Sequence, residues 1–365
     1  MKITRVATSI HRPVSAGEEG RSAVYAGTDG PVFVRCRVET DEGLTGNGFT
    51  GRFLAAEVAH FLNGALGTAA LGMDPLDPDL VNGLEAKFNP RAMTGVVVSA
   101  FSAFEIALTD IRARVAGKSI AGLLGGKRDS VPVHVTCGLP HLDMDALQAT
   151  CRDAVAEGAA GVKVIIADRS RCWEEDAERI VAVREAIGDD ADLIADANCK
   201  LPYEKAVRFA KRAHAAHLAW LEEPLPANDP PALARLSEET GVPLGAGQME
   251  QSPYRFRQLI DQGRIAVIQP NAVFAGGFSR ALEVMRMAED HDRLICPAGG
   301  WDFVNLHLMA GATARGAMEY HAGHAAIVRC ITGRTQQPEN GCLAVPNAAG
   351  LGIGIDENAL ETARL

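Results

Sequence analysis

Short apolar runs recur along the chain from Val131 onward, and each one ends at a polar or small residue. The candidate strands occupy residues 131–138, 161–166, 191–198, 219–225, 242–248, 266–271, 293–300 and 317–321. Most segments between them, such as 174–187 and 203–217, have the spacing of apolar positions that is typical of helices. Eight strands with helical crossovers at nearly even spacing favour a (β/α)8 barrel over an open sheet.

The first part of the chain follows a different pattern. Residues 2–10 and 32–40 are strand-like, and the DEG segment at 41–43 is a turn signal after the second run. Between Ser99 and Ala116, apolar side chains recur at alternating three- and four-residue steps, which predicts a helix with one buried face. An α+β domain is therefore expected before the barrel, and the chain as a whole is assigned to the α/β class.

This pattern divides the chain into three segments. We predict the α+β domain over 1–128, the barrel over 129–345, and a C-terminal tail over 346–365 that packs back on the first domain. A Gly- and Ser-rich stretch at 11–30, which contains Tyr25, interrupts the first domain. Loops of this length in a compact domain are often mobile and functional, and a merely disordered excursion is the alternative.

The composition narrows the range of partners. Hydrophobic residues make up 47% of the chain, and the net charge is −10 without a long basic run, which argues against nucleic acid or an anionic membrane as partner. No segment approaches the ~18 apolar residues of a membrane span, and the first residues lack the apolar core of a signal peptide. The eight cysteines form no CxxC pair, which is typical of reduced, buried thiols in a cytoplasmic protein.

Three acidic or amide side chains stand at equal steps, each at the end of a predicted strand. Glu222 lies 26 residues after Asp196, and Gln248 lies 26 residues after Glu222. A step of this length holds about one strand, one helix and two loops, so successive parallel strands would bring these side chains to one rim. Converging oxygen ligands are what a hard cation such as Mg²⁺ requires. The alternative is an acidic rim that only caps helix N-termini.

Longer motifs occur in a recognisable order. They are TDEGLTGNG at 40–48, SAFSAFEIALTDIRARVAGKSIAGLLGG at 99–126, QPNAVFAGGFSR at 269–280 and PNAAGLGIGID at 346–356. Together with the acids at the strand ends, their order resembles the enolase superfamily. The closer resemblance is to the mandelate racemase and muconate lactonizing enzyme branch, with its acid-sugar dehydratases and cycloisomerases. It covers nearly the whole chain and implies an enolase-like modified barrel with an N-terminal capping domain.

The resemblance implies that a base removes the proton next to a carboxylate while Mg²⁺ stabilises the resulting enediolate. Asp196 and Glu222 match the first two metal-ligand positions of the branch. Gln248 matches the third, where the branch usually has Glu or Asp, and Glu250 is an alternative ligand two residues on. Asn198 matches a polar residue of the pocket wall and is expected to contact the substrate.

The positions of the usual bases depart from the pattern. The branch usually carries K-x-K on the second barrel strand, and here Lys163 is retained while Ile165 replaces the second lysine. Asn271 stands at the sixth-strand position of a lysine or an aspartate, and the seventh-strand segment 297–300 has no histidine. Glu319 matches the acid of the eighth strand that contacts the substrate carboxylate or the enediolate. We assign Lys163, Glu319 and Asn271 to the catalytic set.

A racemase with two bases does not fit these residues, because proton transfer on one carbon normally needs an acceptor on each face. One scheme remains, in which Lys163, desolvated beside a metal, has a lowered pKa, takes the proton and returns it to a leaving hydroxide. The alternative role for Lys163 is a cation that only binds the substrate carboxylate. His321, His324 and Asp302 are the candidate substitute bases, and His321 and Trp301 join Tyr25 and Asn198 as substrate-binding residues.

Three other residues are interpreted as structural. Glu223 is expected to point away from Glu222, because neighbouring side chains alternate along a strand. His134 lies inside the first barrel strand and is expected in the core. Cys296 is expected to pack there too, since no histidine partner is evident in the sequence.

The sequence supports two main hypotheses. The first is a Mg²⁺-dependent lyase or isomerase of a small hydroxy or acid-sugar carboxylate, and the second is a non-catalytic homologue that binds a small anion. Barrel chemistry without a metal is a third. Specificity is expected from loops of the first domain at 11–30 and 46–51. By analogy with the branch, a homo-oligomer, dimer or octamer, is expected.

Overall fold

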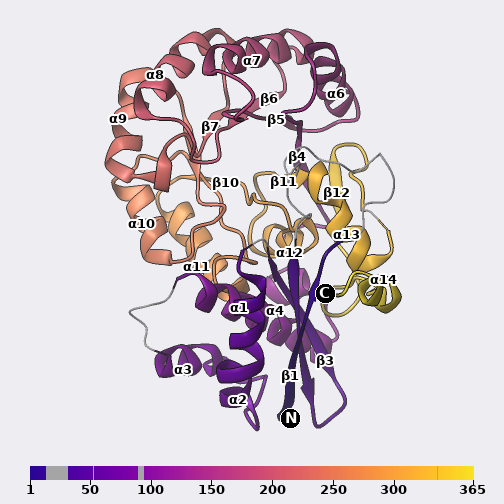
Figure 1. Ribbon diagram of the computed structural model, residues 1–365. Helices are drawn as coiled ribbons and strands as arrows, with labels where there is room; N and C mark the ends of the chain where they lie inside the picture. Colours follow the sequence, from indigo (N-terminus) through magenta and orange to yellow (C-terminus); the bar gives the residue numbers. More distant parts are fainter. Residues whose placement is uncertain (14–31, 52, 89–93, 335) are drawn as a thin grey trace.

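The computed structural model describes residues 1–13, 32–51, 53–88, 94–334 and 336–365, and it has a barrel above a smaller N-terminal domain (Figure 1). The barrel strands are β4 (Ser130–Gly138), β5 (Gly161–Ile165), β6 (Asp192–Asp196), β7 (Trp220–Glu222), β8 (Leu244–Ala246), β9 (Val267–Ile268), β10 (Leu294–Ile295) and β11 (Met318–His321). They are parallel and follow the order β10-β9-β8-β7-β6-β5-β4-β11. This arrangement confirms the predicted barrel.

Helices surround the barrel. They are α6 (Met144–Ala156), α7 (Trp173–Ile187), α8 (Tyr203–Arg212), α9 (Pro230–Thr240), α10 (Pro253–Asp261), α11 (Gly277–Asp290), α12 (Asp302–Ala312) and α13 (Ala325–Thr332). Local signals fix their ends. A capping box between Cys172 and Glu175 starts α7, whereas α9 starts at Pro230 and ends before Gly241, which has a φ of 72°.

The barrel is nearly closed. Within the described strands, the ladder runs from β10 around to β11, and no ladder joins these two ends. The backbone N–H of Glu319 donates to the carbonyl of Pro297 over 2.9 Å across this gap. A short strand that the sequence did not predict, β12 (Cys342–Ala344), pairs antiparallel with the beginning of β4.

The N-terminal domain is an antiparallel sheet covered by helices. The sheet consists of β1 (Ile3–His11), β2 (Phe33–Thr40) and β3 (Thr45–Gly51), in that order. Its helical segments are α1 (Ala55–Phe61), η3 (Leu62–Leu66), α2 (Gly67–Ala70), α3 (Leu80–Lys87), α4 (Val96–Val115) and α5 (Ile120–Leu124). The predicted helix at 99–116 corresponds to α4, which begins three residues earlier than expected.

The segment 46–51 is a strand rather than the loop we expected, and its glycines have a packing role. A Cβ atom on Gly46 would lie 2.1 Å from the carbonyl oxygen of Ala107. A Cβ atom on Gly48 would lie 1.8 Å from that of Ala103. Since no side chain fits in this space, the two glycines allow α4 to lie directly on β3.

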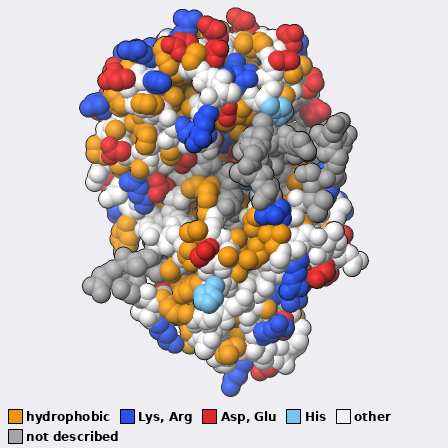
Figure 2. All heavy atoms as spheres, viewed as in Figure 1, with side chains coloured by type: hydrophobic (Ala, Val, Ile, Leu, Met, Phe, Trp, Pro, Cys, Tyr) orange, Lys and Arg blue, Asp and Glu red, His pale blue; other side chains and the backbone are white. Residues whose placement is uncertain are grey.

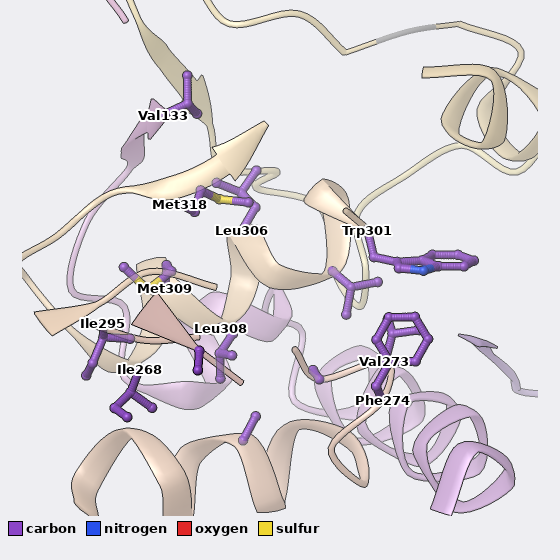
Figure 3. Close-up of a cluster of buried hydrophobic side chains, with 14 of the residues drawn as sticks. Val133, Ile268, Val273, Phe274, Ile295, Trp301, Leu306, Leu308, Met309 and Met318 are labelled. Atoms are coloured by element: carbon purple, nitrogen blue, oxygen red, sulfur yellow. The ribbon is translucent and has the colours of Figure 1, made fainter. Parts of the chain in front are cut away.

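Aromatic side chains join the N-terminal domain to the barrel. The ring of Trp301, which precedes α12, packs on Phe33 of β2 and Phe49 of β3, with centroid distances of 6.0 and 6.4 Å. Figure 3 shows Trp301 near Val273 and Phe274, at one side of the cluster of buried apolar side chains. Trp301 is 2% exposed. The ring that we expected to bind substrate is therefore buried between the two domains.

The C-terminal tail contacts the N-terminal sheet. Its helix α14 (Glu357–Thr362) presents Glu357 to Arg35 of β2, with two hydrogen bonds of 2.7 Å. The N–H of Leu365 also donates to the carbonyl of Ile10 in β1.

Positive and negative side chains are mixed over the face seen in Figure 2. None of the described helices is both long and apolar enough to cross a membrane.

Candidate active site

Lys163 is at the centre of a buried acidic cluster at the C-terminal end of the barrel. Its Nζ atom lies 2.7 Å from Oε1 of Glu222, 2.7 Å from Oε1 of Glu319 and 3.6 Å from Oδ2 of Asp196. Lys163 itself is 2% exposed. Because β5, β6, β7 and β11 each supply one of these side chains, the barrel brings together groups that are far apart in the sequence.

The equal spacing in the sequence corresponds to a shared register in the sheet. Asp196 of β6 pairs directly with Glu222 of β7. The second carboxylate oxygen of Glu222 accepts hydrogen bonds from Nε2 of Gln269 at 2.7 Å and from Nε1 of Trp220 at 3.2 Å. Sequence reasoning missed both donors, although Trp220 lies two residues before Glu222 and thus on the same face of the strand.

Glu319 is held by four donors. Its Oε2 atom accepts the backbone N–H groups of Gly299 and Gly300 at 2.6 and 3.0 Å, and its Oε1 atom accepts the Thr136 hydroxyl at 2.5 Å as well as Lys163. Burial alone would raise the pKa of Glu319, but the charges of Lys163 and His321 and the hydrogen bonds from Lys163 and Thr136 lower it well below its ordinary value. Glu319 is therefore an ionised carboxylate in this arrangement.

The cluster carries more negative than positive charge. Burial raises the pKa of Asp196 and of Glu223, and it raises the pKa of Glu222 to about 7. For Lys163, burial lowers the pKa, but Glu222, Glu319 and Asp196 outweigh burial and raise it well above the ordinary value. The lowered pKa that we expected for Lys163 is thus wrong for this arrangement, because three carboxylates stabilise the ammonium form.

Glu223 also faces the site, contrary to expectation. It has a φ of 40°, so the alternation of side chains along β7 ends there. Its carboxylate accepts Nε2 of Gln248 at 3.0 Å and Nδ2 of Asn228 at 3.0 Å. Asn228 also donates to Glu250, which pairs with Arg255 at 3.3 Å.

A cavity of about 400 Å³ opens beside these groups. It is lined by Phe53, Asn198, Cys199, Glu223, Ala227, Asn228, Gln248, Met249 and Glu250. Phe53 comes from the N-terminal domain, and the other residues follow β6, β7 and β8 at the rim of the barrel. A larger cavity of about 610 Å³ lies beside β12 and α13, away from the acidic cluster.

The chemistry of the donor set suits a hard divalent cation. Asp196 and Glu222 end β6 and β7, Gln248 follows β8, and their carboxylate and amide oxygens are the ligand types that such a cation prefers. Lys163 is the one cation that contacts the three carboxylates of Asp196, Glu222 and Glu319 in the described part of the chain. No group of three or more His, Cys, Asp or Glu residues in the described part of the chain is already arranged as a metal centre. Oε1 of Glu222 is bonded to Lys163, so a cation would share or replace that contact.

The described contacts of Asn271 are with the backbone, and its catalytic role stays a prediction. Its Nδ2 group donates to the carbonyl oxygens of Ala298 and Gly300 at 2.7 and 3.2 Å, and its Oδ1 atom accepts the N–H of Val273 at 3.0 Å. It is fully buried. The side chain therefore holds the loop after β10, the same loop whose N–H groups bind Glu319.

The candidate substitute bases lie close to that loop. The imidazole rings of His321 and His324 stack with a centroid distance of 4.3 Å. Asp302, the first residue of α12, is 5% exposed, and burial together with Glu319 raises its pKa well above the ordinary value. The raised pKa favours the protonated form of Asp302, which cannot accept a proton. Tyr25 lies outside the described residues.

His134 and Cys296 contact each other inside the barrel. The Sγ atom of Cys296 lies 3.6 Å from Nδ1 of His134, and Nε2 of His134 pairs with Asp192 at 2.9 Å. The absence of a histidine partner that we inferred for Cys296 is therefore wrong. Burial nevertheless raises the pKa of the Cys296 thiol, which is 4% exposed, so the residue has a packing role.

Comparison with known proteins places this barrel and its acidic rim in a defined class. Residues 146–359 match the family model described as enolase C-terminal domain-like, and residues 8–125 match the mandelate racemase / muconate lactonizing enzyme N-terminal domain. The protein is thus an enolase-type barrel with its capping domain. It belongs to the mandelate racemase and muconate lactonizing enzyme branch of the enolase superfamily, as the sequence motifs predicted.

Its relatives include several sugar-acid enzymes. L-talarate/galactarate dehydratase of Salmonella typhimurium is 32% identical over 291 residues, 79% of this chain and 71% of that protein. D-galactarolactone cycloisomerase of Agrobacterium fabrum is 28% identical over all of this chain and 99% of its own length. The structure of a racemase from Streptomyces coelicolor with bound magnesium superposes with a TM-score of 0.88 at 25% identity, with both chains fully covered.

Proposed function

We propose that this protein is a lyase that removes the α-proton of a small hydroxylated carboxylic acid and eliminates water. The observation that carries the proposal is the buried cluster of Asp196, Glu222 and Glu319 around Lys163 at the C-terminal end of the barrel. Relatives named as talarate/galactarate and arabinonate dehydratases support the same class of reaction. These relatives are named for different acids, so they support the type of reaction and not one substrate.

Lys163 supplies the positive charge that the carboxylate of such a substrate needs. Its ammonium group is buried and contacts three carboxylates, so a substrate carboxylate would compete with Glu222 and Glu319 for the same donor. Asp196, Glu222 and Gln248 would hold a Mg²⁺ ion. When bound, this ion would supply Lewis-acid stabilisation of the enediolate.

The cavity beside the cluster supports a substrate with several hydroxyl groups. Its polar lining consists of amides and carboxylates, which exchange hydrogen bonds with hydroxyls in both directions. Arg255 is already paired with Glu250 and donates to the carbonyls of Ala227 and Asn228. A second carboxylate on the substrate would therefore meet Glu223 and Glu250, so the lining favours acids with one carboxylate.

Lys163 has two possible roles in the proposed reaction. As a base, it must first lose its proton, which requires that the charge of the three surrounding carboxylates be neutralised, because they raise its pKa. As an ammonium ion, it binds the substrate carboxylate and later the more negative enediolate. In both roles the amino group of Lys163 is required for the reaction, so removal of the side chain abolishes α-proton exchange.

The test is α-proton exchange in D₂O, with Mg²⁺ and a panel of sugar acids, hydroxy acids and amino acids. Wild-type protein is expected to incorporate deuterium or release water from at least one hydroxylated acid. Lys163→Met should lose both activities, whereas Lys163→Arg, which keeps the charge but cannot act as a base, separates the two roles. Absence of exchange with every acid, while a related dehydratase exchanges its own substrate, would overturn the proposal.

A second candidate function is binding without catalysis. The observation in its favour is that Ile165, which is 6% exposed, occupies the usual base position, while Asn271 is bonded to the backbone. Titration calorimetry with the same panel tests this function. Saturable binding of an acid that shows no exchange and no loss of water would support a binding protein.

A further inference from the structure

The two carboxylate oxygens of Glu222 have different kinds of partner. Oε1 accepts a hydrogen bond from the ammonium group of Lys163 at 2.7 Å. Oε2 accepts two uncharged donors, Nε2 of Gln269 at 2.7 Å and Nε1 of Trp220 at 3.2 Å. Glu222 and Gln269 are fully buried, and Trp220 is 4% exposed. The orientation of the carboxylate is therefore determined by these protein contacts and not by solvent.

The missing side chain of Gly245 lets Gln269 reach Glu222 across an intervening strand. Glu222 of β7 pairs with Gly245 of β8, which in turn pairs with Val267 of β9. Gln269 lies two residues after Val267. A Cβ atom on Gly245 would lie 3.3 Å from Oε1 of Gln269 and 2.4 Å from Cδ1 of Trp220. Both donors thus occupy the space that this glycine leaves open.

The indole ring of Trp220 is held in place by its packing. It lies edge-on to the imidazole of His134, with a centroid distance of 5.2 Å and an angle of 82° between the rings. It also belongs to an apolar cluster with Val267 and Cys296. Because these contacts fix the ring, the N–H group is held in the direction of Glu222.

Gln269 leaves its own acceptor unused. Its Oε1 atom is buried and accepts no hydrogen bond from the part of the chain that the structure describes. A buried acceptor without a partner costs free energy, and a methionine of similar length would have no such atom. Rotation of the amide would place Oε1 against the carboxylate, so the donor orientation is the favourable one. The bond from Nε2 to Glu222 is therefore the contact that accounts for an amide at this position.

Uncharged donors orient a carboxylate without neutralising it. A lysine or arginine in place of Gln269 would compete with a metal ion for the negative charge of Glu222. Gln269 and Trp220 carry no charge, so that negative charge stays available to a divalent cation at Oε1. Partners behind a metal ligand commonly orient the ligand in this way.

We propose that Gln269 and Trp220 are positioning residues that hold Glu222 ready as a ligand of a divalent cation, an inference that rests on the proposed function. They bind Oε2, so Oε1 keeps its orientation when a cation shares or replaces the contact with Lys163. Without them the carboxylate can rotate about its terminal bond, which is a soft torsion. The ligand would then be ordered only when the cation binds, and cation binding would be weaker.

The closing experiment titrates the full chain with Mg²⁺ alone in a calorimeter. Gln269→Met keeps the length of the side chain, Trp220→Phe keeps an aromatic ring, and each removes one donor to Oε2. The Kd for Mg²⁺ is expected to rise about 10-fold in each variant and toward about 100-fold in the double variant. Gln148→Met is the matched control, because the Gln148 amide donates one hydrogen bond of 2.9 Å from α6 to the carbonyl of Ala182 in α7. It should bind Mg²⁺ like the wild type.

Thermal unfolding in EDTA shows in parallel whether each variant is folded without the cation, and if Gln269→Met is not, Trp220→Phe decides alone. Weaker binding in the folded variants with an unchanged control would support the inference. Wild-type affinity in Gln269→Met and Trp220→Phe would overturn it and leave the proposed function intact. An equal loss in Gln148→Met would overturn it too, because general loosening would explain the effect. A wild-type protein that binds no Mg²⁺ would contradict the metal site of the proposed function itself, and the inference with it.

Discussion

The carboxylate of Glu105 in α4 accepts a hydrogen bond of 2.7 Å from the backbone N–H of Phe278 at the start of α11. It also accepts the N–H and the hydroxyl of Ser279. A negative side chain of the N-terminal domain thus caps a barrel helix, where the helix dipole favours it. A Cβ atom on Gly277 would lie 2.1 Å from Oε2 of Glu105, so the contact requires glycine there.

Replacement of this cap should destabilise the protein. Glu105→Ala would leave the buried N–H of Phe278 and the N–H and hydroxyl of Ser279 without this acceptor, and the expected decrease in the free energy of unfolding is about 2–4 kcal/mol. Glu105→Gln, which keeps one acceptor oxygen, should lose less. Urea unfolding followed by circular dichroism measures both values. Equal stability of the two variants and the wild type would show that water replaces the cap.

The stability of the protein should depend on pH through the acidic cluster. In the folded protein the pKa of Glu222 is raised from 4.5 to about 7, and those of Asp196 and Glu223 are raised too. Between pH 4.5 and about 7, Glu222 binds a proton more tightly in the folded state than in the unfolded state. The free energy of unfolding therefore falls as pH rises from 4.5 toward 7. The lowered pKa of Glu319 acts in the opposite sense, but only below its ordinary value.

Mg²⁺ should therefore stabilise the protein more at pH 8 than at pH 5, because only the ionised cluster needs a compensating cation. Melting temperatures with and without Mg²⁺ at the two pH values test this difference. Asp196→Asn is the control, since it removes one charge and one ligand together. The same shift in that variant would place the stabilising ion elsewhere.

Gln248→Glu should make the protein more dependent on a divalent cation. The substitution replaces the amide that donates to Glu223 over 3.0 Å with a second carboxylate. Without a cation the expected loss of stability is about 1–3 kcal/mol, and with Mg²⁺ the added ligand should reverse it. Thermal unfolding in EDTA and in Mg²⁺ shows the difference. An unchanged Mg²⁺ effect would mean that residue 248 is not a ligand.

Asn271 offers a test between a structural and a catalytic role. Asn271→Asp has the same shape but faces the carbonyls of Ala298 and Gly300 with an oxygen in place of a donor. The expected loss is about 2–3 kcal/mol, because a buried acceptor then meets two acceptors. Denaturant unfolding gives the stability, and substrate exchange gives the activity. Full stability with lost activity would support the predicted catalytic role of Asn271.

The fold was predictable because the hydrophobic pattern and the strand-end residues agree with each other. Asp196 and Glu222 could be placed on one rim since their spacing matches one strand and one helix, and they do pair in register. The strands are shorter than predicted, for example β10 at Leu294–Ile295 in place of 293–300, because an apolar run does not show where the ladder ends. The glycines at 46–51 were wrongly interpreted as a loop, because glycine occurs both in turns and where two backbones pack closely, as it does here.

The chemistry of the site was less predictable because it depends on contacts distant in sequence. The protonation of Lys163 follows from three carboxylates on three other strands, and no local pattern reveals their combined effect. Glu223 points into the site because its φ is positive, and the local sequence does not predict this backbone conformation. His324 and Gly300 are similarly separated in the chain, and only the fold shows that one fills the space left by the other.

The gap between β10 and β11 gives Glu319 a mechanical importance as well as a chemical one. Its backbone N–H bonds Pro297 and its side chain bonds Gly299 and Gly300, so one residue joins the two free edges of the barrel. A local fluctuation that separates β10 from β11 would therefore also break the contact between Glu319 and Lys163. Amide hydrogens of residues 298–300 should then exchange faster than those elsewhere on the barrel rim, and a bound ligand that contacts Glu319 should slow this exchange.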